Sequence, residues 1–574
     1  MLPENSAATT QHWLIDVIGL AFIITLFYLI WIGHFPLFTP DEGRYPEVAR
    51  EMVQTGNYIT PRVNGVAFLD KPILYYWLQA LAIHLFGIKE WALRLFPALL
   101  GVLASLVTYA CGRHLFDRRT GLLSAIILAT SPLFFAGSHY ANLDLEVASL
   151  ITCTLLFLIC GLQSVTPLRS YWLGAAYTSA AFAFLTKGLI AVAFPCMIGG
   201  AWIALLGRWQ ALKSMRLLLG TLWFTAIVLP WYALVQKANP AFLHFFFLTQ
   251  QVTRFLSAAE FNNKTPFWFY APIVLIGFFP WTIFLIQSLT TAIKQTWHDR
   301  MRHQTTLYLL LWTGIVFVFF SVPHSKTIGY IFPIFPPLAL LTGHYLSENW
   351  TRTRETGLHL SALIFAVSGI VLTALLFFAN EHQWAVLTPA FFPYLSTIAA
   401  ILLISGLLAW HLRNKKNCLP LITLCVICST SSLLTLTLGA KDLNTNTSKP
   451  LATYLKTVLQ PEDEVATYFK YYQDLPLYLE RRITIVAKWH SPDIAQTDNW
   501  ARELWYGMAF QNTDDWLIEE KTFWQRWNSH KHVYVFVNDN YLAKFTEGAL
   551  HYVYLGKYND ILLLSNQPVN KLPL

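Results

Sequence analysis

Long apolar runs separated by short polar loops make up most of this chain. Several runs continue for about 18 to 22 residues without a charged side chain, which is the length a helix needs to cross the hydrocarbon core of a membrane. This pattern predicts an all-α polytopic membrane protein with about thirteen transmembrane helices. The predicted spans are 13–33, 92–112, 121–138, 145–163, 171–186, 188–206, 217–236, 269–289, 306–322, 330–346, 358–379, 388–411 and 418–439.

Two regions depart from this pattern. The stretch from Ile73 to Phe86 is apolar and aromatic but too short for a span, so we predict an interfacial helix there. Beyond residue 440 the runs shorten to "DEVATYF", "ITIVA", "HVYVFVN" and "DILLLSN", which are typical of strands, with a helical stretch near Lys449 to Leu459. We therefore expect a transmembrane domain at 1–439, with outer amphipathic helices within 34–90, and a small soluble α/β domain at 440–574.

The composition supports a membrane protein. Only 13% of the 574 residues are charged and 55% are hydrophobic, whereas soluble domains carry about 25% charged residues. The first apolar run lacks the basic start and small-residue cleavage site of a signal peptide, so we interpret it as a retained helix. The seven cysteines lie in or beside apolar segments, which favours helix packing over disulfides or metal binding. The net charge of +8 fits basic cytoplasmic loops and not a nucleic-acid partner.

The basic residues predict an orientation. The loops "GRHLFDRR", "GRWQALKSMR", "KQTWHDRMRH", "TRTRE" and "HLRNKKN" fall on one side of the predicted spans and hold fourteen Lys and Arg against three acids. By the positive-inside rule this side is cytoplasmic, together with the N-terminus. After an odd number of spans the C-terminal domain lies outside, and a miscount by one span would invert that placement.

Charged residues also occur on the outer side, where the positive-inside rule gives no reason for them. In "FTPDEGRYPEVAREM", Asp41 and Arg44 lie three residues apart on one helical face and are expected to pair. The alternative is a capping box, with Thr39 as the N-cap, Pro40 at the first helical position and Glu42 closing the box. That alternative does not account for Arg44.

Two further outer stretches place charge at the ends of apolar segments. In "NGVAFLDKPILYYW", Asp70 and Lys71 are either an interface anchor or a site for a lipid phosphate. In "GSHYANLDLEVAS", Asp144 and Glu146 open a span, where acids also favour the helix dipole. In "FLTKGLIA", Lys187 either snorkels to the interface or faces an anion from a tight turn.

The last outer stretches are "VPHSKTIGYIFPIFPPLAL", with Lys326 and Tyr330, and "TQQVTRFLSAAEFNNKTPFWFY", with Arg254. Together the outer stretches supply a few carboxylates and about five cations next to lipid. Cations stabilise phosphate charge, and a carboxylate orients or deprotonates an acceptor. This set of residues therefore suits a reaction on a lipid-linked phosphate.

The order of these motifs resembles a known family. Asp-Glu-x-Arg-Tyr, an acid-Lys-Pro followed by Tyr-Tyr-Trp, an acid between spans, Thr-Lys-Gly and Ser-Lys-x-x-x-Tyr occur in that order. The chain thus resembles the GT-C membrane glycosyltransferases of the aminoarabinose transferase type, which modify lipid A on the periplasmic face, and is also similar to protein O-mannosyltransferases. The resemblance implies a GT-C fold with a periplasmic α/β domain in the bacterial inner membrane, and a polyprenyl-phosphate-linked sugar donor that reacts with inversion.

The resemblance also implies roles for single residues. Asp41 matches the essential acid of the first outer loop and Arg44 its partner, whereas Lys71 matches the phosphate-binding lysine. Asp144, Lys187 and Tyr330 match an outer-loop acid, lysine and tyrosine. The expected catalytic residues are Asp41 and Asp144, and the expected donor-binding residues are Arg44, Lys71, Lys187, Arg254, Lys326 and Tyr330.

The chain departs from the family at several positions. The acid before the lysine is usually Glu and is Asp70 here. A Glu-His pair is replaced by Gln250 and Gln251, and a histidine before the Pro-Phe-Trp run by Asn262 or Asn263. Those histidines are linked to a metal site in the family, so their absence argues against a metal and against aminoarabinose as the sugar. A divalent metal at Asp70 is kept as an alternative, and no cofactor is assigned.

The expected activity is transfer of a sugar from a polyprenyl-phosphate donor to a lipid A-type or other envelope lipid or glycan acceptor, among membrane lipids and without nucleic acid. The cations would hold the departing phosphate, while Asp41 orients or deprotonates the acceptor. One alternative is a protein O-glycosyltransferase or polysaccharide-modifying transferase of the same fold. Another is a lipid-linked-sugar flippase or transporter, although transporters tend to place charge at the membrane midplane and to show repeats.

Overall fold

The computed structural model of the chain describes residues 6–253, 265–351, 358–381, 388–412, 415, 417–443, 446–496, 499–547 and 551–569. Contacts divide the chain into two compact units. The helical unit comprises residues 1–35, 94–230 and 263–444, and the mixed unit comprises residues 36–93, 231–262 and 445–574. The mixed unit therefore combines the segment after the first apolar helix with the C-terminal part. The division into domains at residue 440 stays a prediction.

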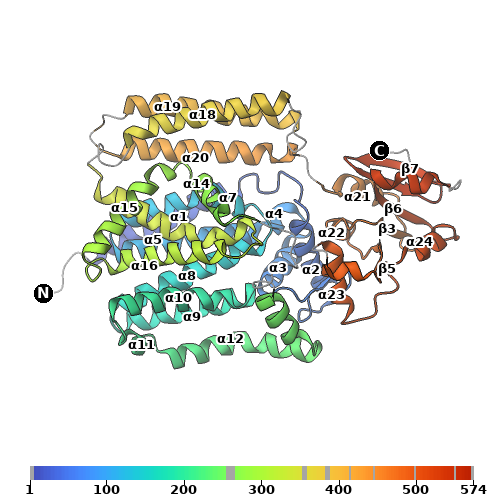
Figure 1. Cartoon of the computed structure of the whole chain (residues 1–574), viewed down its shortest axis with the longest axis horizontal. Coiled ribbons are helices and arrows are strands. Elements are labelled where there is room, and N and C mark those ends of the chain that lie inside the picture. The colour runs from blue at the N-terminus through green and yellow to red at the C-terminus, as the bar shows by residue number, and fades with distance from the viewer. Residues whose placement is uncertain are drawn as a thin grey trace. The chain divides into compact units, whose positions relative to one another are not determined.

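The helical unit consists of α-helices joined by short loops (Figure 1). Its main helices are α1 (Ser6–Leu29), α5 (Leu95–Leu115), α6 (Arg118–Ala129), α7 (Pro132–Ser138), α8 (Leu143–Gln163), α9 (Leu168–Lys187), α10 (Ile190–Leu206), α11 (Ala211–Ser214), the first part of α12 (Leu217–Ala238), α14 (Tyr270–Gly277), α15 (Thr282–His298), α16 (Gln304–Ser321), α17 (Phe335–Glu348), α18 (Leu358–Glu381), α19 (Phe392–Leu412) and α20 (Leu419–Gly439). Short 3-10 turns are η2 (Phe267–Phe269), η3 (Ile328–Ile334), η4 (Pro389–Phe391) and η5 (Ala440–Asp442).

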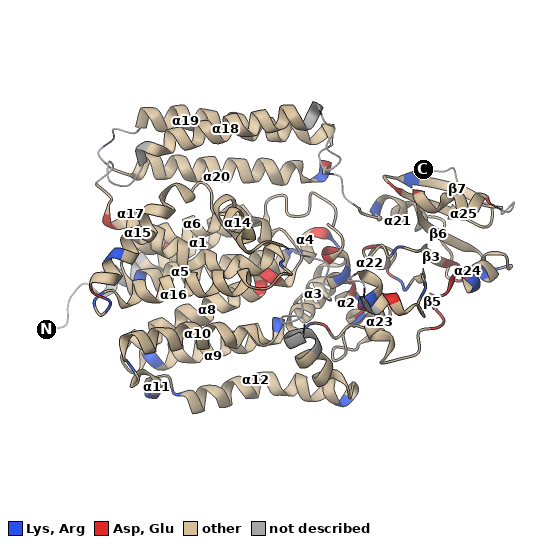
Figure 2. Ribbon diagram, viewed as in Figure 1, with Lys and Arg blue, Asp and Glu red and all other residues tan. Residues whose placement is uncertain are grey.

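The helices agree with the prediction of a polytopic membrane protein. Among the described residues, seven are long and apolar enough to cross a membrane, or up to nine if each of two bent pairs is one span. The bent pairs are α6 with α7, at 65°, and α14 with α15, at 115°. Figure 2 shows that the long helices carry few charged residues along their lengths. A helical membrane architecture is therefore confirmed, whereas the number thirteen stays a prediction.

Helices α8 and α9 position part of the candidate site. Asn142 caps α8, its side-chain oxygen accepting a hydrogen bond from the backbone N–H of Asp144 at 2.8 Å. The two helices form an antiparallel hairpin, because Thr186 at the end of α9 bonds to Glu146 in the first turn of α8. The beginning of α8 and the end of α9 consequently lie at the same end of the hairpin.

The mixed unit contains a six-stranded sheet with surrounding helices. Its N-terminal segments are α2 (Asp41–Thr55), β1 (Arg62–Val63), β2 (Val66–Ala67), α3 (Leu74–Phe86) and α4 (Glu90–Leu93), and the π-helix η1 covers His244–Thr253. The C-terminal part holds α21 (Lys449–Leu455), β3 (Glu464–Tyr468), α22 (Leu475–Leu479), β4 (Thr484–Val486), η6 (Pro492–Gln496), α23 (Trp500–Met508), β5 (Leu517–Ile518), α24 (Glu520–Trp527), β6 (Val533–Asn538), η7 (Asp539–Tyr541), α25 (Leu542–Thr546), β7 (Val553–Tyr558) and β8 (Ile561–Ser565).

The sheet has the strand order β5-β4-β3-β6-β8-β7. Strands β3, β4, β5 and β6 are parallel, whereas β8 and β7 are antiparallel to their neighbours. The four predicted strands are confirmed as β3, β4, β6 and β8, and α21 confirms the predicted helical stretch. The prediction missed β5, which has only two residues, and the edge strand β7, which is largely unburied.

The core of this sheet explains why its central strands were predictable. All residues of β3, β6 and β8 are buried, and α24 and α25 add Phe523, Trp527 and Phe545 against them. Continuous apolar runs are typical of strands that are covered on both faces. The predicted short apolar helix near residues 73–86 is confirmed as α3.

Candidate active site

Two groups of side chains collect most of the predicted site residues, one in each unit. We call them the Lys187 cluster (Asp144, Lys187, Gly329 and Tyr330, with Glu146 and Thr186) and the Arg44 cluster (Asp41, Arg44, Tyr45, Phe68, Tyr76 and Glu503).

The Lys187 cluster is a buried cation held by an acid and an aromatic ring. The Lys187 ammonium forms a salt bridge with Asp144 Oδ1, and only 14% and 9% of the two side chains are exposed. The ammonium also lies 4.2 Å from the centre of the Tyr330 ring. A cation over a ring face gains about 0.5 to 2 kcal/mol, more when water is excluded. Three residues that lie far apart in the sequence thus fix one positive charge.

Two neighbours fix the acid side of this cluster. A side chain at Gly329 would collide with the Asp144 carboxylate, so the glycine lets the turn carrying Tyr330 approach closely. Two residues further along α8, Glu146 is fully buried, and its Oε1 accepts a hydrogen bond from Thr186 at 3.0 Å. Its other oxygen has no hydrogen-bond partner among the described residues. The sequence indicated Glu146 only as a helix-start acid.

The Arg44 cluster confirms the predicted pairing within α2. Arg44 bonds to Asp41 at 2.6 Å and, through its other terminal nitrogen, to Glu503 of α23. The guanidinium also faces the rings of Tyr45 at 5.0 Å and Phe68 at 5.7 Å. Burial alone would lower the pKa of Arg44, but Glu503, Tyr45 and Asp41 outweigh it, and the pKa is raised. Arg44 is therefore a permanent cation between two carboxylates.

Two members of this cluster were not singled out from the sequence. Tyr76 is fully buried beside Tyr45, and within the part of the chain that the structure describes neither its hydroxyl nor Arg44 Nε has a hydrogen-bond partner. Burial raises the pKa of Tyr76 well above its usual value, so its hydroxyl stays a donor. Tyr76 belongs to the Tyr-Tyr-Trp run, which was a usable signal. Glu503 is separated from Arg44 by most of the chain, and no local pattern marks it.

The capping-box alternative for the start of α2 is wrong about Thr39, which does not cap the helix with its side chain. Pro40 occupies the N-cap position without a side-chain bond, and the Thr39 hydroxyl instead donates to the Asn446 carbonyl at 3.1 Å. The Glu42 carboxylate does accept a hydrogen bond from a preceding backbone N–H, that of Phe38, at 2.8 Å. A Cβ on Gly43 would lie 2.6 Å from the backbone nitrogen of Asp474, so only glycine fits between Glu42 and Arg44.

The structure gives other contacts for two of the remaining predicted residues, Lys71 and Lys326. Lys71 Nζ donates to the Asp70 carbonyl at 3.3 Å, and Asp70 is buried. Lys326 is also buried and donates to the Thr265 carbonyl at 3.2 Å. The predicted Arg254 lies outside the described residues, as do Asn262 and Asn263.

The expected metal site at Asp70 stays a prediction. Within the described ranges, no three His, Cys, Asp or Glu side chains come together as a candidate set of metal ligands. A metal bound through protein side chains usually takes several such groups. The mechanism proposed below is derived from the side chains of the two clusters.

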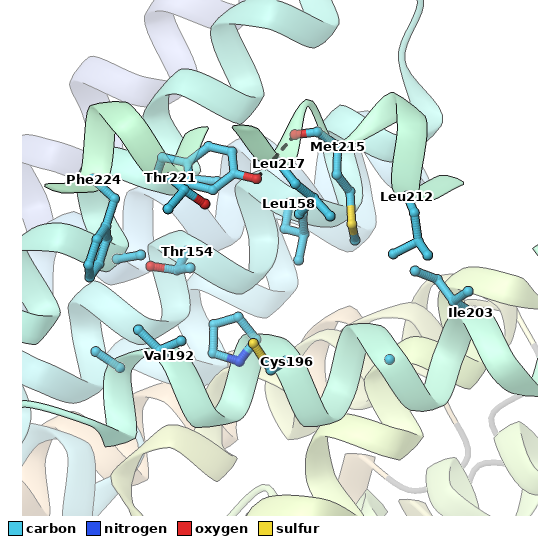
Figure 3. Close-up of a pocket in the computed structure, with 16 residues that line it drawn as sticks. Thr154, Leu158, Val192, Cys196, Ile203, Leu212, Met215, Leu217, Thr221 and Phe224 are labelled. Carbon is cyan, nitrogen blue, oxygen red and sulfur yellow. Dashed lines mark hydrogen bonds between the residues drawn. The ribbon is translucent and has the colours of Figure 1, made fainter. Parts of the chain in front are cut away.

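The helical unit also contains an apolar cavity of about 450 Å³ (Figure 3). Helices α8, α9, α10 and α12 and the segment around α11 line it, and the figure shows side chains such as Leu158, Val192, Ile203 and Phe224 around it. Thr154 on its wall lies ten residues along α8 from Asp144, a rise of about 15 Å. The cavity is thus lined by the same helices that carry the Lys187 cluster.

Comparisons with known proteins support the resemblance that the motifs indicated. Residues 70–234 match the family described as dolichyl-phosphate-mannose-protein mannosyltransferase. The chain is 32% identical over 352 residues to an undecaprenyl phosphate-alpha-4-amino-4-deoxy-L-arabinose arabinosyl transferase of Erwinia tasmaniensis, covering 60% of this chain and 62% of that protein. It is 31% identical over 327 residues to the enzyme of the same description from Pseudomonas aeruginosa, covering 56% and 58%. The alignments thus span less than two thirds of these relatives.

The fold is similar over nearly the whole chain to a solved structure. ArnT from Cupriavidus metallidurans, bound to undecaprenyl phosphate, superposes with a TM-score of 0.83 at 24% identity and covers 97% of this chain and 98% of its own. The apo state of the same protein gives a TM-score of 0.82. These comparisons confirm the resemblance to the aminoarabinose transferases and the GT-C-type fold.

Proposed function

We propose that this chain transfers a sugar from a polyprenyl-phosphate donor to a lipid A-type acceptor on the periplasmic face of the bacterial inner membrane, with inversion at the anomeric carbon. The names of the relatives make 4-amino-4-deoxy-L-arabinose the first sugar to test. The observation that carries the proposal is Lys187, whose side chain is only 14% exposed and is held by Asp144 and Tyr330. Lys187 and Asp144 lie on α9 and α8, which also line an apolar cavity. A lipid-linked phosphate needs both a cation and a place for its chain.

The proposed reaction is a single displacement. An acceptor oxygen attacks the anomeric carbon and forms the new glycosidic bond, while the bond from that carbon to the donor phosphate oxygen breaks. The electron pair leaves with that oxygen, so the phosphate gains one negative charge and departs as polyprenyl phosphate. A group that binds the more highly charged phosphate stabilises the transition state more than the ground state.

Lys187 supplies such a group. In the absence of substrate its charge is neutralised by Asp144, which avoids a buried unpaired ion. The donor phosphate either binds Lys187 together with Asp144 or takes the place of Asp144. As the phosphate gains negative charge during the reaction, its bond to the ammonium becomes stronger. Tyr330 keeps the ammonium in place from the ring side. We assign Lys187 and Tyr330 to donor binding and Asp144 to holding the cation.

Arg44 is assigned to donor binding, where its positive charge would stabilise the leaving phosphate. Asp41 positions the acceptor. The carboxylate of Asp41 is already bonded to Arg44, which favours a positioning role over that of a free base. A phosphate acceptor, with a second pKa near 6, is largely ionised at neutral pH and needs no base. A hydroxyl acceptor would give its proton to Asp41. Lys71, Lys326 and Arg254 remain predicted donor-binding residues.

The donor's prenyl chain would occupy the apolar cavity of Figure 3. An isoprenoid chain has no polar groups to satisfy, and the cavity walls are almost entirely hydrocarbon. Removing apolar surface from water gains about 25 cal/mol per Å². The chain would therefore contribute binding energy that does not depend on the sugar.

The membrane topology is part of the same proposal. About thirteen spans would place the N-terminus in the cytoplasm and the C-terminal domain in the periplasm. The basic loops of the sequence support this orientation. With this topology, the beginning of α8 and the end of α9 face the periplasm, where lipid A is modified.

A second candidate is transfer of the sugar to a protein hydroxyl. The family that matches residues 70–234 carries a protein mannosyltransferase description and favours this alternative. A serine or threonine acceptor requires a base, so the rate would fall at low pH as the base becomes protonated. With a phosphate acceptor no such dependence on Asp41 is expected.

The test compares cells that express the wild type or Asp41→Asn, with exposed Glu547→Gln as the control variant. Mass spectrometry of lipid A should show an aminopentose-sized addition in the wild type and in the control, and almost none in Asp41→Asn. Purified protein should also transfer the sugar from undecaprenyl phosphate. If lipid A is unchanged in every strain while the purified protein glycosylates a peptide, the acceptor is a protein and the main proposal is wrong.

A further inference from the structure

The C-terminal sheet carries a polar cavity that the proposed reaction does not use. It has a volume of about 500 Å³, within the range of small-molecule sites. Its walls are Tyr468, Phe469, Ala487, Lys488, Ser491, Asp493, Ile494, Asn499, Trp500, Ala501, Glu520, Tyr541 and Lys544. None of these residues belongs to the Lys187 or Arg44 clusters.

The position of this cavity in the sheet is the one where ligands bind in open α/β folds. Strands β3, β4, β5 and β6 are parallel, so their carboxyl ends share one edge. The wall residues follow those four ends, with Tyr468 closing β3, Lys488 after β4, Glu520 after β5 and Tyr541 after β6. The chain adds β4 and β5 on one side of β3 and then β6 on the other. Such a reversal of strand order creates a crevice at the carboxyl edge.

Aromatic rings form one part of the cavity wall. Phe469 and Tyr541 stack at 5.6 Å with 24° between their planes, and Tyr468 meets Tyr541 edge-on at 5.7 Å. Trp500 is braced by Trp489 at 6.0 Å and is half-buried. The negative faces of such rings attract the polarised C–H groups of a ligand.

Fixed polar groups complete the wall. The Tyr468 hydroxyl donates to Glu520 Oε1 at 2.5 Å, and the Trp524 indole donates to the same oxygen at 3.3 Å. Asn499 caps α23 with its side-chain oxygen, which accepts from the N–H groups of Ala501 and Arg502. These bonds hold one carboxylate and one amide in place, and neither bond to Glu520 uses its second oxygen.

The charges of the wall argue against an anionic ligand. Lys488 and Lys544 are balanced by Asp493 and Glu520, so the four charged side chains sum to zero. A phosphate would gain from the two lysines but would be repelled by the two carboxylates. A ligand with many hydroxyls can instead donate to the carboxylates and accept from the lysines and the amide. Carboxylates, amides and aromatic faces together are suited to a saccharide.

We propose that this cavity is a binding site for a sugar unit of an uncharged or zwitterionic saccharide, held against Phe469, Tyr541 and Trp500 and oriented by Asp493, Asn499 and Glu520. This site is separate from the groups assigned to sugar transfer, and its existence does not depend on the proposed function. A transferase with such a site would recognise a glycan in addition to the bond that reacts.

The experiment uses the full-length protein in nanodiscs and saturation-transfer NMR. The probes are methyl β-D-glucopyranoside and methyl β-D-galactopyranoside, with inorganic phosphate as the anionic comparison. We expect at least one glycoside to show saturation transfer and a millimolar Kd. Asp493→Asn and Tyr541→Ala should each weaken that Kd about fivefold or more. Asp493 is exposed, so its replacement leaves the fold intact even if Tyr541→Ala does not.

Three controls separate this site from the others. Asp514→Asn and Lys521→Ala change exposed charges outside the cavity wall and should leave the Kd unchanged. Lys187→Met removes the proposed donor phosphate contact and should also leave it unchanged. Absence of glycoside binding, equal binding by the cavity variants, or loss of binding only in Lys187→Met would each overturn the inference. Tighter binding of phosphate than of either glycoside would overturn the assignment of ligand class.

Discussion

Replacing Lys187 by methionine tests whether its charge serves catalysis or only neutralises Asp144. Methionine keeps most of the length of the side chain and its packing, but it removes the ammonium from the salt bridge and from the Tyr330 ring. Loss of a well-placed group that stabilises transition-state charge usually lowers the rate by about 10² to 10³, equivalent to about 2.7 to 4 kcal/mol. We expect a decrease of that size in kcat/KM for transfer from the lipid-linked donor.

The same variant should also be less stable, because it leaves the Asp144 carboxylate buried without its partner. Breaking a buried ion pair from one side costs about 3 to 5 kcal/mol, and replacing both partners by neutral groups is often close to neutral. The double variant Lys187→Met/Asp144→Asn should therefore unfold closer to the wild-type temperature. Its activity should remain low, since the phosphate contact is still missing.

The measurements are donor-dependent transfer by purified protein and thermal unfolding in the same detergent. The matched control is Lys237→Met, which removes an exposed lysine from the last turn of α12. If the double variant recovers activity together with stability, Lys187 only balances Asp144 and the assignment to phosphate binding is wrong. If activity stays low while stability returns, the two roles are separated.

Three further changes test other parts of the structure. Burial, followed by the charge of Glu47, raises the pKa of Glu51 from 4.5 to about 8. The free energy of unfolding of the wild type should therefore fall as pH rises from about 4.5 to 8, by at most about 1.4 kcal/mol per pH unit. Glu51→Gln should make the melting temperature less dependent on pH across that range, and the same pH dependence in both proteins would contradict the raised pKa of Glu51. Gly43→Ala should lower stability by about 1 to 3 kcal/mol in chemical or thermal unfolding, because its Cβ meets the Asp474 backbone. Gly174→Ala is the control, because Gly174 lies inside α9 with nothing within 4 Å of an added Cβ, and it should not lower stability. Cys196 is the one exposed cysteine and lines the apolar cavity, so polyprenyl phosphate should slow its labelling by a hydrophobic maleimide, and equal labelling rates would place the prenyl chain elsewhere.

The sequence predicted those features that local pattern determines. Each predicted span coincides with a helix or a bent pair of helices, because an apolar run in a membrane has few other ways to satisfy its backbone. Among the described residues, seven to nine of these helices are long and apolar enough to cross a membrane. The pair of Asp41 and Arg44 was predictable because residues three apart share a helical face. Strands β3, β6 and β8 were predictable because they are buried on both faces.

Features that depend on distant segments could not be predicted in this way. β5 has two residues and forms a strand only because β4 lies beside it. Glu503 pairs with Arg44 only because folding brings the two together, and the sequence around Glu503 contains no motif that would indicate a site residue. The salt bridge of Lys187 with Asp144 had a usable signal, however. One residue opens α8 and the other closes α9, and the two ends of an antiparallel hairpin lie together.

Both candidate clusters pair their cation with carboxylates, one for Lys187 and two for Arg44, and this arrangement has a consequence for specificity. An unpaired buried ammonium or guanidinium would be costly and would bind any anion that reached it. Because Asp144 neutralises Lys187, and Asp41 and Glu503 flank Arg44, a phosphate gains only the difference between its own bond and the bond it replaces. That difference is small for the singly charged phosphodiester of the donor and grows as the leaving phosphate acquires its second charge. Since the replaced bond is the same in both states, the pairing weakens binding of the ground state and of the transition state equally and limits the binding of other anions. The preference for the transition state comes from the second charge of the leaving phosphate, which speeds the chemical step.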